Sequence, residues 1–187
     1  MHDSTRRKVM KTVAVLFLFS ISAFAQDLSV VAAESACGPT NTRFSLTTKA
    51  NEGQQPMLQP DPGKALVYVV EDQKFKVVND VTTRVGVDGT WVGANRGNSY
   101  FSFSLEPGKH HLCTDWISGF VPSGRLVSLT SFNAESGEVY YLRARTSASP
   151  TSGKAGAGAS IDLDLVNEDE GRLLVASSAL SISQQKK

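Results

Sequence analysis

Short apolar segments separated by turn residues recur through most of this 187-residue chain, and this pattern limits the fold more than any other feature. Ala65–Val70 is continuously apolar and rich in β-branched residues, as in a central strand covered on both faces. Tyr100–Leu105 alternates strictly, with Phe101, Phe103 and Leu105 on one face. Strands of this kind at intervals of about 8–12 residues are typical of a β-sandwich.

A tight hairpin is predicted where Asp88-Gly89 joins the arms Thr82–Val87 and Thr90–Val92, because both turn residues must tolerate positive φ angles. Further strands are expected at Lys109–Trp116, Leu126–Phe132, Glu138–Arg145 and Ile161–Val166. We therefore predict an all-β fold, an antiparallel β-sandwich of about seven to nine strands.

The C-terminal part adds a candidate short helix from Glu168 to about Ala179. Asn167 followed three residues later by Glu170 resembles a capping box, which marks a helix start. Gly171 argues against this helix, and a hairpin turn at Asn167–Gly171 is the alternative interpretation.

The N-terminus resembles a cleavable signal peptide covering residues 1–25. The apolar run Val13–Phe19 is too short to span a bilayer, and Ala23–Ala25 supplies small residues at the usual cleavage spacing. The basic residues that precede the run are Arg6, Arg7, Lys8 and Lys11. An N-terminal membrane anchor is the less favoured alternative, and no transmembrane segment is expected in the mature chain. We expect export to the periplasm or the extracellular space.

Removal of this leader leaves a weakly acidic chain. It takes four bases and one acid from totals of 19 and 18, which leaves 15 basic and 17 acidic residues and a net charge of −2. Nucleic-acid binding is not expected, since it needs clustered positive charge. We divide the remainder into a mostly polar segment 26–61 with one candidate edge strand at Arg43–Thr47, a β-sandwich domain 62–180 and a polar tail 181–187.

The chain has two cysteines, Cys37 and Cys113, and an oxidising compartment favours a disulfide between them. Cys113 is expected to point away from the core face that carries Leu112 and Trp116. Closing a loop of about 77 residues is worth roughly 4–5 kcal/mol in the chain-entropy model. Lipid attachment at Cys37 is the less favoured alternative, because the upstream residues include Glu34 where such a signal has Leu or Val.

Five short motifs occur in the same order as in one bacterial protein family: Pro62–Val69, Val87–Gly89, Ser99–Phe101, Pro107–His110 and Val139–Arg143. Through these motifs, over residues 62–176, the chain resembles the domain-of-unknown-function family 2846 (DUF2846) of envelope or secreted proteins, often lipoproteins. The resemblance implies a sandwich-like β domain in the cell envelope. It implies no activity and no catalytic residues. The lipid-attachment motif is missing here.

His110 and His111, the two histidines of the mature chain, are the most suggestive polar pair. Neighbours on a strand point to opposite faces, so the two rings cannot easily share a metal ion. We expect a structural role for one ring and a solvated position for the other. Trp91, Tyr100 and Trp116 are candidates for a ligand-binding face together with this pair, although completing the core is the simpler interpretation.

Signatures of catalysis are weak throughout. The sequence contains no nucleophile elbow and no phosphate-cradling loop. Candidate acids for glycoside chemistry are Glu71, Asp72, Asp115 and Glu138, and a C-terminal acidic cluster comprises Asp162, Asp164, Asn167, Asp169 and Glu170. Lacking the glycine placement of a calcium loop, the cluster is better explained as a solvated strand face and helix start.

These observations predict no catalytic residues, no metal site and no cofactor. The favoured function is a non-enzymatic binding or structural module of the envelope, with an envelope protein or glycan as partner. The alternative is a small hydrolase or metal-dependent enzyme that uses His110 or His111 with nearby carboxylates.

Overall fold

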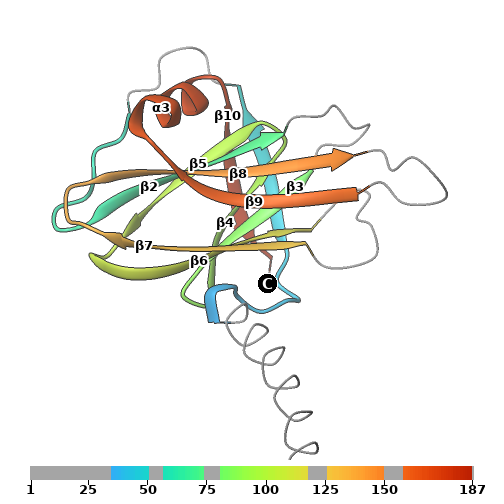
Figure 1. Ribbon diagram of the computed structural model, residues 1–187, viewed down its shortest axis with the longest axis horizontal. Helices are drawn as coiled ribbons and strands as arrows, with labels where there is room; N and C mark the ends of the chain where they lie inside the picture. Colours follow the sequence, from blue (N-terminus) through green and yellow to red (C-terminus); the bar gives the residue numbers. More distant parts are fainter. Residues whose placement is uncertain (1–34, 51–56, 74–80, 118–125, 150–157, 187) are drawn as a thin grey trace, which may run out of the picture.

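Two β-sheets packed together and one short helix make up the described part of the chain (Figure 1). The computed structural model describes residues 35–50, 57–73, 81–117, 126–149 and 158–186. The expected signal peptide 1–25 lies outside these residues. In chain order the elements are β1 (Phe44–Lys49), β2 (Ala65–Gln73), β3 (Thr82–Val87), β4 (Thr90–Arg96), β5 (Ser99–Leu105), β6 (Gly108–Trp116), β7 (Val127–Ala134), β8 (Val139–Ser149), β9 (Gly158–Val166), α3 (Glu168–Ala176) and β10 (Ala179–Gln185).

The strand order is β1-β10-β5-β2-β8-β9 in the larger sheet, sheet A, and β4-β3-β6-β7 in the smaller sheet, sheet B. The predicted sandwich is confirmed, with ten described strands in place of the expected seven to nine. The expected purely antiparallel arrangement is wrong for sheet A, which is mixed: β2 runs parallel to β8 and β10 runs parallel to β5. A hairpin cannot join parallel neighbours, and the chain accordingly passes through sheet B twice between β2 and β8.

Strand β2 is buried on both faces, as its continuous apolar sequence predicts. Ala65, Val67 and Val69 belong to the main core between the sheets, with the inward residues of β3, β5, β6 and β8. The alternate residues Leu66 and Tyr68 belong to a second core on the outer face of sheet A. Helix α3 packs over β2 and β8 and covers this second core (Figure 1).

Helix α3 is the short helix expected at the C-terminal end. The Asn167 side chain accepts a hydrogen bond from the Glu170 backbone N–H at 2.9 Å, which confirms the predicted cap. The helix ends at Ala176, earlier than expected. Gly171 faces Tyr141, where a Cβ atom would lie 2.1 Å from the ring carbon Cγ. The glycine that argued against a helix is therefore the residue that lets the helix approach the sheet.

Strand β10 begins at Ala179, where the helix was expected to end, and runs into the segment 181–187 that was expected to be a polar tail. Its sequence alternates Leu180 and Ile182 with Ser181 and Ser183. Ser181 is buried, whereas Ile182 is exposed, so the hydroxyl-bearing face points into the molecule. The inverted polarity hid this strand from a hydrophobic pattern search.

Serine side chains also connect the two sheets. On one side, the Ala94 N–H of β4 donates to Ser183 Oγ at 3.1 Å, and Ser181 Oγ donates to the Ala94 carbonyl at 2.8 Å. On the other side, the Leu163 N–H of β9 donates to Ser128 Oγ of β7 at 3.1 Å. Both edges of sheet B are thereby linked to sheet A.

The replacement Gly171→Ala tests the contact between α3 and sheet A. Alanine by itself favours a helix by about 1 kcal/mol over glycine. We nevertheless expect the free energy of unfolding to fall by about 1–3 kcal/mol, because the added methyl group collides with Tyr141. Urea denaturation measures the change. The control Leu173→Ala, at a position 68% exposed on the same helix, should shift stability by less than about 0.5 kcal/mol. A Gly171→Ala variant as stable as the wild type would contradict this packing.

Candidate functional site

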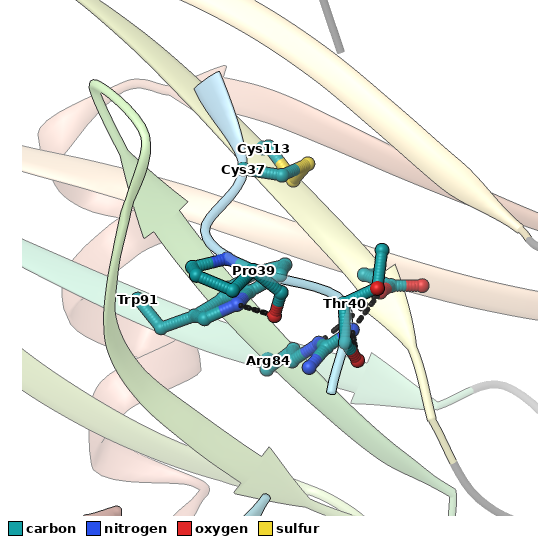
Figure 2. The surroundings of a disulfide bond; sticks show 7 residues. Cys37, Pro39, Thr40, Arg84, Trp91 and Cys113 are labelled. Carbon is teal, nitrogen blue, oxygen red and sulfur yellow. Dashed lines mark hydrogen bonds and ion pairs between the residues drawn. A yellow bond between two sulfur atoms is a disulfide. The ribbon is translucent and has the colours of Figure 1, made fainter. Parts of the chain in front are cut away.

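The segment that precedes β1 lies across the outer face of sheet B and is fixed there by a disulfide bond (Figure 2). Cys37 and Cys113 are bonded, with their Cα atoms 5.3 Å apart, which confirms the expected pairing. Cys113 belongs to a cluster outside the main core, whereas its neighbour Leu112 belongs to that core. Cys113 therefore points outwards from β6, as the sequence predicted.

Two glycines allow the segment to lie close to the strands. A Cβ atom on Gly86 of β3 would lie 2.9 Å from the Ala36 carbonyl oxygen. A Cβ atom on Gly38 would lie 2.4 Å from a carbon of the Trp91 ring. Trp91 Nε1 donates a hydrogen bond to the Pro39 carbonyl at 2.8 Å (Figure 2). The segment thus packs directly on β3 and β4.

Arg84 of β3 is a second attachment point for this segment (Figure 2). Its guanidinium group donates to the carbonyl oxygens of Thr42 at 2.6 Å and Thr40 at 3.1 Å. It also donates twice to Asp115 Oδ2, at 2.7 and 3.1 Å, and lies 4.0 Å from the Trp91 ring centroid. Arg84 is only 3% exposed, so the ion is buried with its charge balanced by Asp115.

Beyond Arg84 the outer face of sheet B forms the floor of a groove of about 970 Å³. Thr82 pairs with Arg96 in the ladder of β3 and β4, and the Ile117 N–H donates to the Thr82 carbonyl at 2.9 Å. The start of β1 forms a wall of the groove. The lining residues are Thr40, Asn41, Thr42, Arg43, Phe44, Ser45, Leu46, Thr82, Arg84, Arg96, Asp115, Trp116, Ile117 and Lys186.

The groove lining is basic. Arg43, Arg96 and Lys186 are exposed and form no ion pair with another residue in the described ranges. Asp115, the acidic residue among the described lining, is already paired with Arg84. Among the described residues, the lining therefore carries more positive than negative charge.

The sequence analysis did not find Arg84 or the groove. Strand alternation places Arg84 on the same face as Gly86, opposite the core residues Val85 and Val87. Such a face is ordinarily solvated, and only the predicted disulfide indicated that another segment covers it. The available sequence signals for a covering segment were Gly86 and Arg84, which lie on the same outer face of sheet B as Cys113.

His110 and His111 lie beside the hairpin turn of Asp88 and Gly89. That turn has positive φ at both residues, 48° and 81°, which confirms the predicted hairpin. His110 Nδ1 is 2.6 Å from Asp88 Oδ2, and Nε2 is 2.8 Å from the Glu106 carbonyl oxygen. Each ring nitrogen of His110 therefore already has an oxygen atom of the protein within hydrogen-bonding distance.

The same contacts change the pKa of the Asp88 carboxyl group. Partial desolvation raises its pKa, but hydrogen bonds from the His111 backbone N–H and the His110 ring outweigh this effect. The pKa of Asp88 is consequently lower than that of an ordinary aspartate. The His111 side chain is exposed.

The three candidate aromatic residues are buried in three separate clusters. Trp91 packs with the disulfide, Tyr100 packs with Tyr68 on the outer face of sheet A, and Trp116 packs with Ile161. They form no common platform with His110 and His111, and of the three only Trp116 lines the groove. Ligand contact by these residues stays a prediction.

The candidate catalytic acids are separated. Glu71 lies fully buried and accepts a hydrogen bond from Thr83 Oγ1 at 3.0 Å, whereas Asp115 lies on the outer face of sheet B with Arg84. Asp72 is 3.9 Å from Arg145 Nε. The acids therefore serve different structural contacts.

In the C-terminal acidic cluster, Arg143 forms ion pairs with Asp164 and Glu170. A cation already occupies the position where calcium would have to bind. Within the described ranges, no group of three or more His, Cys, Asp or Glu residues is placed to hold a metal ion.

A family model described as "Protein of unknown function (DUF2846)" matches residues 61–159, just over half of the chain. The match runs from β2 to the first residues of β9, and β1, α3 and β10 lie outside it. No curated protein and no solved structure matches the chain.

Replacing Asp88 with asparagine tests the contact with His110. Asparagine tolerates the positive φ angle, so the turn is retained, while the charge and one of the two acceptor oxygens are lost. Because the folded-state pKa is lowered, the carboxylate stabilises the fold above its unfolded-state pKa of about 3.9, and this contribution disappears as the pH falls through the folded-state value. The gap between wild type and Asp88→Asn should be about 1 kcal/mol or less at pH 5.5, since the pair is partly exposed. It should close towards pH 2.5.

Chemical denaturation across this pH range measures the gap. The control is Glu135→Gln, which alters an exposed carboxylate in the turn between β7 and β8. Its difference in stability from the wild type should not shrink as the pH falls. A gap for Asp88→Asn that widens as the pH falls would contradict the assignment.

Proposed function

The chain belongs to the DUF2846 family, and we propose that it is an exported module of the cell envelope that binds a ligand in the groove beside β1. The main observation in favour of this proposal is that the segment leading into the groove wall is fixed in place without a ligand. The disulfide holds the segment at Cys37, and Arg84 holds it at Thr40 and Thr42. A preformed concave surface of this size with unpaired charges is typical of a binding site, because little ordering entropy is lost on binding.

Export is supported by the disulfide as well as by the N-terminal sequence, since such bonds persist in oxidising compartments. The Sγ atom of Cys37 is bonded to Cys113 and is thus not available for a lipid thioether, which favours a protein without a lipid anchor. In the part of the chain that the structure describes, no helix has the length and apolar character to cross a bilayer.

The enzymatic alternative has less support. Both ring nitrogens of His110 already contact protein oxygen atoms, one of the Asp88 carboxylate and one of the Glu106 backbone carbonyl. The carboxylates considered for catalysis are divided between the interior and the outer faces. A binding role requires none of these groups.

Export predicts a processed chain. We expect the intact mass of the protein recovered from the envelope or the medium to correspond to a chain that starts at Gln26, or to its cyclised form. Mass spectrometry with and without reductant also reports the disulfide through a difference of about two mass units. A chain that retains residues 1–25, or one with a lipid on Cys37, would contradict the proposal.

A variant in which a larger side chain fills the groove tests whether the ligand binds there. Ile117 lies on the groove floor and is 36% exposed, so Ile117→Trp should occupy the groove without disturbing the core. Leu129→Trp is the matched control, because Leu129 is 44% exposed on the same outer face of sheet B but outside the groove lining.

The immobilised proteins are incubated with envelope extract, and the retained lipids, glycans and peptides are identified by mass spectrometry. Wild type and Leu129→Trp should enrich the same component. Ile117→Trp should bind this component at least about ten-fold more weakly, which corresponds to about 1.4 kcal/mol of binding free energy. Equal retention by all three proteins would rule out the groove as the binding site.

A further inference from the structure

The ligand class can be specified from the groove itself, an inference that rests on the proposed function. We propose that the groove binds an anionic amphiphile in which a phosphate group is attached to an apolar chain. The phosphate would contact Arg43, Arg96 and Lys186. The apolar chain would lie against Phe44 and Leu46 of the wall and Ile117 of the floor.

The charge distribution supports an anion. The mature chain expected from the sequence has a net charge of −2, yet the groove lining carries four basic residues and one acidic residue. One of the four, Arg84, already donates to Asp115 and to two backbone carbonyls. The other three have no ion-pair partner in the part of the chain that the structure describes, and we assign them to the ligand. Concentrating them in one cleft of an acidic molecule raises the local concentration of anions.

Three cations fit phosphate better than a single carboxylate. Arginine side chains present a planar set of donors that matches phosphate oxygens in a bidentate manner, and a phosphate monoester can carry two negative charges. Arg43 is on the segment next to β1, Arg96 ends β4, and Lys186 follows β10. The three residues thus approach the groove from different elements, as expected around a polyvalent headgroup.

The apolar residues of the lining indicate more than a free inorganic ion. Phe44 and Leu46 of β1 are half-buried, and Ile117 is exposed on the floor. These side chains would gain from contact with an alkyl chain, at about 25 cal/mol per Å² of apolar surface removed from water. A volume of about 970 Å³ lies at the upper end of the usual range for small-molecule pockets. An acidic peptide would use the cations but would leave these apolar contacts unmade.

Calorimetric titration of the processed protein with dodecyl phosphate, below its critical micelle concentration, tests the inference. Inorganic phosphate tests the headgroup alone, dodecyl maltoside tests the same chain on a neutral headgroup, and hexaglutamate tests an acidic peptide. Vesicles of phosphatidylcholine with phosphatidylglycerol separate a bilayer headgroup from a free amphiphile. We expect dodecyl phosphate to bind at least ten-fold more tightly than the other three soluble probes.

Two exposed groove positions and one distant position provide the variants. Arg43→Gln and Arg96→Gln should each weaken dodecyl phosphate binding at least five-fold. Arg172→Gln, which alters an exposed arginine on α3 over the other sheet, should leave binding unchanged. Thermal melts confirm that all three variants are folded. Vesicle binding, if present, should fall in the same two groove variants.

Several outcomes would overturn the inference. Dodecyl maltoside or hexaglutamate binding as tightly as dodecyl phosphate would do so, as would unchanged binding in both groove variants. Vesicle binding without binding of free dodecyl phosphate would indicate surface attraction instead of a groove ligand. If dodecyl phosphate fails while envelope material is still captured in a manner that Ile117→Trp abolishes, the ligand class is wrong and the groove remains the binding site. Failure of both experiments would overturn the proposed function as well.

Discussion

The buried guanidinium ion of Arg84 is the interaction on which the outer layer of this molecule depends. Burying such an ion costs several kcal/mol unless its charge and its N–H groups are satisfied. Asp115 supplies the opposite charge, Trp91 covers the ion, and the carbonyls of Thr40 and Thr42 accept two further hydrogen bonds from it. The dependence is mutual, because those carbonyls belong to backbone outside any helix or strand and need donors of their own. The disulfide fixes the segment at Cys37, and Arg84 adds attachments at Thr40 and Thr42, close to the point where the chain enters β1.

Much of the fold could be predicted because its signals are local. The turn residues of the hairpin at Asp88, the cap at Asn167 and the alternation along the strands each act within a few positions of the chain. The missed parts depend on what lies opposite a residue in space. Strand β10 was missed because its serines face inwards to hydrogen-bond with Ala94. Arg84 was missed because strand alternation shows which face a residue occupies, but it does not show whether another segment covers that face.

The groove combines parts of the chain that differ in their relation to the family. Its floor, at Thr82, Arg96 and Ile117, lies within residues 61–159, which the family model matches. Arg43 on the wall and Lys186 at the C-terminus lie outside that match. Two of the three cations without an ion-pair partner among the described residues therefore lie outside the part of the chain that the family model matches. The strands that bring them to the groove, β1 and β10, also lie outside the match, although both belong to sheet A.

The serine bridges between the sheets have a mechanical consequence. An apolar core holds two sheets together but does not fix their offset, because the hydrophobic effect has no preferred direction. Hydrogen bonds are directional, and those from Ser181, Ser183 and Ser128 connect the sheets along both sides. The sheets consequently resist sliding past each other. The floor of the groove belongs to sheet B, and one wall belongs to strand β1 of sheet A. The hydrogen bonds that oppose sliding of the sheets therefore also preserve the width of the groove.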